Sequence, residues 1–188
     1  MQEPIYLRPL SSNDINDKYL FWVNDSSITE YLEIGKQNHE YEDLERYVND
    51  SKKNGRHNYA AITKNSQNHI GNGSIYSIEL EKRKFQIGWF VGEKNYWGGH
   101  YSSMIIFYLF KIGFIEMGLD KCCGYVEKTH IKARMTNKFS GFKEKDEESR
   151  LVNKKNKNKI FIKLEINKKE WLARAKILHS QYPELYKF

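Results

Sequence analysis

The sequence predicts a mixed α/β domain in which helices cover a mostly antiparallel sheet. Segments whose apolar residues alternate with a period of two are interleaved with segments whose apolar residues recur at helical spacing. The chain has 188 residues, 39% hydrophobic and 29% charged, which is typical of one globular domain with a sizeable core. No repeat or linker interrupts it, so we expect residues 1–188 to form a single domain, with 168–188 a C-terminal helix packed on it.

The first half of the chain predicts one strand, two helices and three further strands. The first strand is expected over Ile5–Leu10. Ser11 and Ser12 can then cap a helix with an apolar stripe. A second helix is expected over about Glu40–Lys53, because Gly55 follows as a stop signal. The three strands are expected at Asn58–Thr63, Ile70–Ile78 and Phe85–Val91.

The second half predicts three helices and at least two strands. A glycine-rich turn at Trp97–His100 leads into a long helix over about Tyr101–Met117, with Gly118 just beyond its end. The elements expected after it are a strand at Lys121–Glu127, a short helix at Ile131–Phe139 ended by Gly141, a polar turn at Arg150–Asn158, a strand at Ile160–Ile166 and a helix at Lys168–Gln181.

Charge is unevenly placed along the chain. The net charge is +7, and residues 150–188 hold 11 Lys and Arg against 3 Asp and Glu, so the first 149 residues are close to neutral. Nucleic-acid binding over the whole fold, which needs a widespread basic surface, is therefore disfavoured. The turn at Lys154–Lys159 is expected to be a solvated hairpin, with contact to an acidic acceptor or to RNA as the alternative.

The cysteines and the apolar stretches indicate a cytoplasmic protein without a membrane segment. Cys122 and Cys123 are adjacent in a predicted strand, so their side chains point to opposite faces and cannot form an ordinary disulfide with each other. The most apolar stretch, Met104–Ile115, is shorter than the ~20 residues of a membrane-spanning helix. The N-terminus lacks a signal-peptide pattern, and neither the cysteines nor the histidines have metal-ligand spacing.

The sharpest chemical signal is the strand, glycine-rich turn and helix at residues 85–117. Such a turn exposes consecutive backbone amides at the positive end of a helix dipole, and these donors suit a diphosphate. Gly98 and Gly99 let the backbone approach a ligand without a Cβ in the way. A turn of this kind is also common as plain turn chemistry, and its glycine spacing differs from the dinucleotide-binding fingerprint.

A longer set of motifs resembles the GNAT superfamily of acyl-CoA-dependent N-acyltransferases. The motifs are IGWFV at Ile87–Val91, YWGGHYS at Tyr96–Ser102, GLDKCCGYV at Gly118–Val126, HIKARMTNKFSGF at His130–Phe142 and, upstream, YLRPL at Tyr6–Leu10, FWVND at Phe21–Asp25 and HIGNGSI at His69–Ile75. Their order and spacing cover roughly residues 5–172. The chain looks most like the branch that holds the ribosomal-protein alanine acetyltransferases and many amino-sugar acetyltransferases.

The resemblance implies a V-shaped splay between the central strand and the strand at Lys121–Glu127, with acetyl-CoA as co-substrate and no metal. The diphosphate would contact the amides of Gly98–Ser103, and the pantetheine would run beside Trp89–Val91. The thioester would lie in the splay, where an amine attacks it directly. The cofactor-binding residues implied are Trp89, Phe90, Val91, Trp97, Gly98, Gly99, His100, Tyr101, Ser102, Ser103, His130 and Ala133.

The chain departs from the family pattern at positions that bear on catalysis. His100 stands where a glycine is expected and Ser102 where glycine or alanine is usual, so the ring could crowd the phosphates or donate a hydrogen bond to one. His130 replaces an asparagine that often contacts CoA, and it is a candidate general base. Asn137 replaces a tyrosine that often protonates the leaving thiolate, and its amide can only hydrogen-bond that thiolate.

The general base is otherwise open. Glu30, Glu79 and His69 are further candidates, as is a chain of waters to bulk solvent. Gln86 lies on the central strand where relatives often carry glutamate, and its amide cannot take a proton.

The resemblance also implies an acceptor site. The expected substrate-binding residues are Trp22, Asn24, Glu30 and Gln86, and the stretch WVND at 22–25 resembles one familiar in amino-sugar members. We therefore expect a small-molecule amine acceptor, such as a nucleotide-linked amino sugar. The alternatives are a protein N-terminus, a CoA-binding protein that has lost catalysis, and RNA binding through the basic tail. The last helix could also form a homodimer contact.

Overall fold

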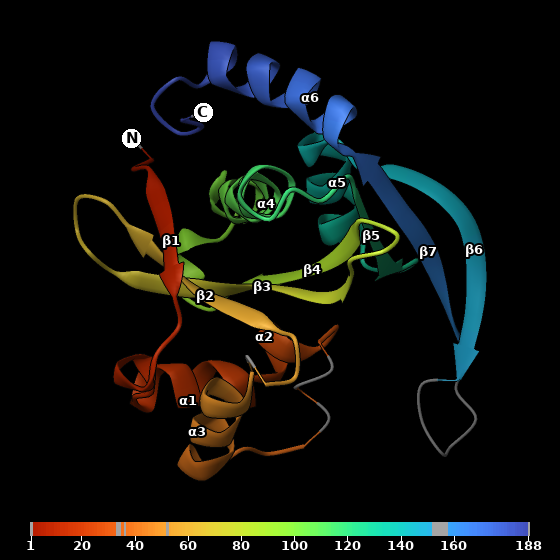
Figure 1. Ribbon diagram of the computed structural model, residues 1–188. Coiled ribbons are helices and arrows are strands. Elements are labelled where there is room, and N and C mark those ends of the chain that lie inside the picture. The colour runs from red at the N-terminus through yellow and green to blue at the C-terminus, as the bar shows by residue number, and fades with distance from the viewer. Residues whose placement is uncertain (1, 33–34, 36, 52, 152–157, 188) are drawn as a thin grey trace.

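The computed structural model describes residues 2–32, 35, 37–51, 53–151 and 158–187. One seven-stranded sheet runs through the molecule in the order β1-β2-β3-β4-β5-β7-β6, with helices on both of its faces (Figure 1). The strands are β1 (Ile5–Pro9), β2 (His57–Thr63), β3 (His69–Glu79), β4 (Lys84–Val91), β5 (Lys121–Glu127), β6 (Lys143–Leu151) and β7 (Asn158–Asn167). The fold class is therefore confirmed: an α/β domain with a mixed, mostly antiparallel sheet.

The parallel pair in this sheet lies at its centre. Strands β4 and β5 run parallel, and the other neighbouring strands are antiparallel. The parallel register extends only from Lys84 opposite Lys121 to Gln86 opposite Cys123. Beyond those residues β4 stays paired with β3 and β5 stays paired with β7, so the two halves of the sheet separate.

Two groups of helices cover the two faces. On one face lie α1 (Asp17–Asn24), α2 (Ser26–Thr29) and α3 (Tyr41–Asp50), below the sheet in Figure 1. On the other lie α4 (Tyr101–Lys111), α5 (Ile131–Ser140) and α6 (Lys168–Gln181). Helix α4 is apolar almost all round and most of its residues are buried, as expected of a helix enclosed by other elements.

The larger core lies around α4. Phe85 of β4 packs edge-on against Phe114, at 5.1 Å between ring centroids, and Trp171 of α6 packs against Phe114 at 5.5 Å. A smaller core beneath the opposite face joins Trp22 of α1 to Phe90 of β4, at 6.3 Å. The central strand is therefore anchored on both faces, which fixes its position relative to α4 and α1.

The first helix begins later than the serines at 11 and 12 predict. Residues Ser12–Asp14 form a 3-10 turn in which the Asp14 carboxylate accepts from the Ser11 amide at 2.8 Å and pairs with Arg8. The α-helix starts afterwards, where the Asn16 side chain accepts from the Tyr19 amide at 3.0 Å. The Asp14 side chain binds a backbone amide in the 3-10 turn, so the α-helix does not start there. It starts where Asn16 caps the longer helical segment.

The long central helix is confirmed, with a change of pitch near its end. After α4 the chain continues as a π-helical turn, η4 (Ile112–Glu116), and Gly118 follows with φ +68°. Gly113 lies in this turn against the Phe85 ring, where any side chain would overlap the ring. The close approach of the ring accounts for a glycine at this position.

The sequence pattern does not delimit strand β6, because nearly every residue in it is polar or charged. Residues 150 and 151, expected in the polar turn, belong to this strand. It forms the edge of the sheet beside β7. Its acidic residues pair with neighbouring basic side chains, including Glu144 with Arg134 and Glu147 with Lys128. Charged edge strands resist pairing with other chains. Of the lysine-rich turn expected at Lys154–Lys159, the structure describes only residues 158 and 159, which begin β7.

Helix α6 has the predicted bounds, and the chain continues beyond it. Trp171, Ala175 and Leu178 are buried on its inner side. After the helix, the chain returns toward the N-terminal segment, and the Tyr186 side chain is fully buried. In the described part of the chain, the helices are either too short or too polar to traverse a bilayer.

Candidate active site

The separation of β4 and β5 leaves open space beside Gly124. This is the first residue of β5 after the last β4 pair, Gln86 with Cys123. A Cβ built on Gly124 would meet no atom within 4 Å, although the residue is buried. From Ile87 onwards, the edge of β4 that faced β5 pairs with no strand in the described part of the chain. The fold therefore provides a strand edge and room beside it at the centre of the sheet.

The first turn of α4 follows the end of β4. Trp97 ties the turn to the strand, because its indole Nε1 donates to the Val91 carbonyl at 2.8 Å. Gly98 adopts φ +80°, which favours glycine, and His100 is already helical at φ −78°. The first bond into the helix runs from the Met104 amide to the His100 carbonyl, at 2.8 Å. The preceding first-turn amides have no intrahelical acceptor, which makes this end of the helix a suitable anion site.

The His100 ring is held by the end of the chain. Its Nδ1 lies 3.0 Å from the Tyr186 hydroxyl, and its ring packs against Tyr182 at 4.5 Å and Phe139 at 5.4 Å. Burial lowers the pKa of His100 and raises that of Tyr186 to about 12. A neutral imidazole therefore meets a protonated phenol. The His100 ring would crowd the phosphates only if it pointed toward them. It points instead into this aromatic cluster.

Two further contacts order the same turn. The Ser103 hydroxyl lies 2.6 Å from the Tyr186 hydroxyl and donates to the His100 carbonyl at 2.8 Å. The Gln2 side chain accepts from the His100 amide at 3.2 Å and lies against Gly99. Both chain ends therefore contact the turn that leads into α4.

His130 follows β5, the second of the two separated strands. It precedes α5, and its ring stacks on Tyr31 with 3.9 Å between centroids and 12° between planes. Burial lowers the pKa of His130, and the charges of Glu30 and Glu127 oppose that shift. The structure therefore brings together two of the candidate general bases, Glu30 and His130, near the C-terminal end of β5.

An ion pair supports this corner. Glu127 pairs with Lys159 and accepts from the Thr129 hydroxyl at 2.7 Å. Burial alone would raise the pKa of Glu127, but the hydrogen bonds from Lys159 and Thr129 leave it lowered. The Lys159 ammonium also lies 5.8 Å from the centre of the Tyr31 ring. The stacked pair is thus flanked by fixed charges of both signs.

The other predicted cofactor and catalytic residues lie on the elements that border the splay. Ala133 and Asn137 share the buried side of α5 with Ser140. Trp89 and Phe90 lie on the separated part of β4 and Val91 ends that strand. Tyr101 and Ser102 follow His100 in the first turn of α4.

The predicted acceptor residues have different surroundings. Trp22 is buried against Phe90. The Asn24 side chain is engaged with the backbone of His39, accepting from its amide at 2.8 Å and donating to its carbonyl at 3.0 Å. Gln86 is half-buried at the last β4–β5 pair, and Glu30 is exposed.

The remaining candidate bases lie away from the splay. Glu79 pairs with Lys82 and Lys84 at the closed end of β4. His69 lies beside α1, packed on Trp22 with 5.0 Å between ring centroids.

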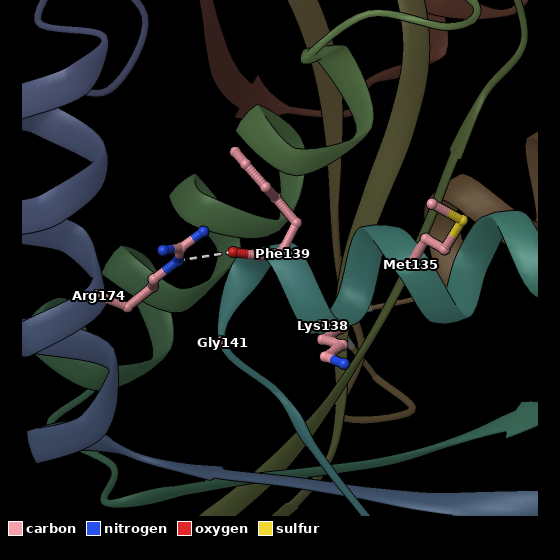
Figure 2. A pocket seen from close by; sticks show the side chains of 5 residues that line it. All are labelled: Met135, Lys138, Phe139, Gly141 and Arg174. Atoms are coloured by element: carbon pink, nitrogen blue, oxygen red, sulfur yellow. Dashed lines mark hydrogen bonds between the residues drawn. The ribbon is translucent and has the colours of Figure 1, made fainter.

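A separate depression lies between α5 and α6. Figure 2 shows its five lining residues, Met135, Lys138, Phe139, Gly141 and Arg174. Its volume is about 600 Å³, and it is open and mostly apolar. The Arg174 Nε donates to the Phe139 carbonyl at 2.7 Å, and the guanidinium lies 4.9 Å from the Phe139 ring. The depression thus adjoins the His100 cluster through Phe139.

Sequence reasoning missed several residues around the site. The sequence patterns do not single out Glu127, Arg56 and Tyr186. Their roles depend on contacts between segments far apart in the chain, for which a single sequence carries no signal. Among the residues that the structure describes, no group of three or more His, Cys, Asp or Glu side chains could hold a metal ion.

Two solved structures resemble this fold closely. A spermidine N-acetyltransferase from Vibrio cholerae, in complex with CoA and spermine, superposes with a TM-score of 0.78 at 18% identity over 89% of this chain and 98% of that one. A GNAT-family acetyltransferase from Bacillus anthracis gives 0.77 at 17% identity, over 90% and 98%. At such identities the likeness shows the fold alone.

Sequence comparison identifies the family. No curated protein matches the chain. The model of the acetyltransferase (GNAT) domain, however, matches residues 5–143, which run from the first strand through α5 to the start of β6. This match includes the glycine-rich turn, the separated strands and the His130 corner. The chain therefore belongs to the GNAT acetyltransferase family.

Proposed function

We propose that this acetyltransferase moves an acetyl group from acetyl-CoA to the primary amine of a small molecule, such as a nucleotide-linked amino sugar. The observation that carries the proposal is the separation of β4 and β5 beside the free first-turn amides of α4. The strand edge, the open space at Gly124 and the helix terminus match the three parts of a CoA thioester: its peptide-like arm, its acyl end and its diphosphate.

The residues present fit such a ligand. The amides of Gly98–Ser103 would hold the diphosphate once the Gln2 side chain leaves the His100 amide. The edge of Trp89–Val91 that is not paired with β5 would hold the arm. When bound, acetyl-CoA supplies an activated acyl group. The His130 imidazole, kept neutral by burial, would accept the proton of the amine, and the Glu30 carboxylate would stabilise the resulting imidazolium. Asn137 would offer an amide donor to the departing thiolate.

The acceptor proposal has separate support. The Vibrio cholerae structure contains spermine, a small amine, which agrees with a small-molecule acceptor. The amino-sugar assignment rests on the WVND stretch at 22–25. The Asn24 side chain is hydrogen-bonded to the His39 backbone. An effect of Asn24 on the acceptor would therefore act through the position of the segment at His39.

The test is release of free CoA thiol with a panel of amino sugars and their nucleotide derivatives, amino acids, polyamines and peptides. We expect amine-dependent release. Gly124→Leu should lower it at least about tenfold without unfolding the protein, because the side chain fills the open space where the acyl end would lie.

Gly124→Ala is the matched control, since a methyl group there meets nothing within 4 Å, and it should stay within about twofold of the wild type. Acetyl-CoA binding without thiol release across the whole panel would instead support a degenerate CoA-binding protein. Release with peptides alone would support a protein N-terminal acetyltransferase.

A further inference from the structure

Arg56 lies on the sheet face opposite α4, just before β2. Its Nη1 donates to the Ser74 hydroxyl of β3 at 3.1 Å, and its guanidinium stacks 4.3 Å from the centre of the Tyr76 ring. The residue is half-buried, and among the described side chains no carboxylate pairs with it. A guanidinium has five donors, so most of its hydrogen-bonding capacity remains available. An oriented, unpaired arginine of this kind favours an anionic ligand.

A second unsatisfied donor lies beside it. Asn58 is directly opposite Ser74 in the β2–β3 register, so the two side chains share one face. Asn58 is 8% exposed, and its Oδ1 accepts from the Tyr47 hydroxyl at 3.0 Å, while its Nδ2 has no hydrogen-bond partner among the residues that the structure describes. Buried amide donors are nearly always satisfied in folded proteins. The Asn58 Nδ2 therefore indicates a ligand group that accepts a hydrogen bond from it.

Gly88 of the next strand lies between these donors and the splay. Gly88 of β4 is directly opposite Ser74, and a Cβ there would come within 3.1 Å of the Ser74 hydroxyl and 3.4 Å of the Tyr76 ring. Gly88 lies two residues past Gln86, where β4 has already lost its β5 partner. Strands are about 4.8 Å apart, so a small molecule over Gly88 would span from the strand edge to Arg56.

We infer that Arg56, with Asn58, binds an anionic group on the acceptor, so that the acceptor is an amine carrying a carboxylate or a phosphate. This inference rests on the proposed function and names the class of substrate for the same site. A polycationic amine would place positive charge against the guanidinium, which is unfavourable in a partly desolvated site. The amine end would lie toward the splay and the anionic end toward β2.

Matched acceptor pairs test this. Each pair shares its amine and differs in the anion: an amino acid against its carboxamide, and glucosamine against glucosamine 6-phosphate. We expect kcat/KM to favour the anionic member of at least one pair about tenfold or more, and the favoured pair distinguishes carboxylate from phosphate. Arg56→Gln should remove that preference by lowering kcat/KM for the anionic member.

Arg56→Lys should restore part of the preference, because it keeps the charge without the planar fork. Arg46→Gln is the matched control: Arg46 lies on α3, its side chain is 70% exposed and it pairs with Asp43. It should retain the wild-type preference. Equal rates for both members of every pair, or a preference that survives Arg56→Gln, would overturn the inference while leaving the proposed function intact.

A binding measurement keeps the two proposals separable. Glucosamine 6-phosphate and the amino acids are titrated calorimetrically into the CoA complex of the wild type and of Arg56→Gln. Binding that weakens about tenfold in the variant supports the anion site even if no acetyl transfer is seen, in which case only the proposed function fails. Absence of binding by every anionic probe, or binding equal in both proteins, contradicts the site.

Discussion

At the scale of single residues, His69 shows how the fold sets a side chain's charge. Its ring lies between α1 and the sheet, packed on Trp22. Its Nε2 lies 2.8 Å from the Asn72 Oδ1 and 3.1 Å from the Gly71 carbonyl, so this nitrogen carries the proton that both oxygens accept. Burial lowers the pKa of His69 from 6.5, and the neutral form fits the site.

This lowered pKa predicts acid sensitivity. The unfolded chain takes up a proton on His69 near pH 6.5, whereas the folded chain resists it, so the free energy of unfolding should fall as the pH drops from about 7 to 5. His69→Gln, whose amide can still donate to Asn72, should show a smaller fall over that range. Denaturant titrations at several pH values measure this. An equal fall in both proteins would show that His69 does not cause it.

Other side-chain contacts could not be predicted from the sequence. The stack of Tyr31 on His130, the donation of Tyr47 to Asn58 and the contact of Arg56 with Ser74 each join segments that are distant in the chain or separated by a turn. The types of these residues permit the contacts but do not dictate them. The Asn24 bridge to His39 similarly depends on where the chain returns after α2.

At the scale of elements, α4 depends on the segment that follows α6. Tyr186 is fully buried and places its hydroxyl against Ser103 and His100 in the first turn of α4. The same ring packs on Phe107 in the next turn, at 5.3 Å between centroids. The end of the chain thus serves as a cap on the outer side of the helix terminus proposed to bind the diphosphate.

Graded substitutions separate the two contributions of Tyr186. Tyr186→Phe removes only the hydroxyl and should lower the free energy of unfolding by about 1 kcal/mol. Tyr186→Ala also removes the buried ring and should lower it by about 3–5 kcal/mol. Tyr182→Phe is the control, because its hydroxyl makes no hydrogen bond with the described residues, and should change it by less than about 0.5 kcal/mol. Urea denaturation checks the series, and equal losses for both phenylalanine variants would exclude the hydroxyl network.

Elements with strong local signals were predictable, and those governed by the whole sheet were not. Helix α6 and strand β5 have the predicted bounds because their apolar periodicity and their caps agree. Strand β6 lacks such periodicity, since an edge strand can be charged along most of its length. The π-helical turn at Ile112–Glu116 arises from the packing of Gly113 on Phe85, which periodicity cannot show.

At the scale of the whole molecule, the candidate site exists because the two halves of the sheet separate between β4 and β5. Packing of Phe85 above and Phe90 below fixes β4 within one half of the sheet, while β5 follows β7 in the other half. The halves share only three registered residue pairs. The sequence motifs placed the turn and the strands on this frame. The packing of the helices below the sheet, beside the proposed acceptor site, is not predictable from these motifs.

The most direct test of the central claim is a titration of the ¹⁵N-labelled protein with acetyl-CoA, followed by amide chemical shifts. The account predicts that the largest shifts occur at Gly98, Gly99, Ser102 and Ser103 in the turn and first helical turn, and at Gly124 beside the splay. Saturable shifts elsewhere with these five amides unmoved, or no shifts at all at millimolar acetyl-CoA, would contradict it.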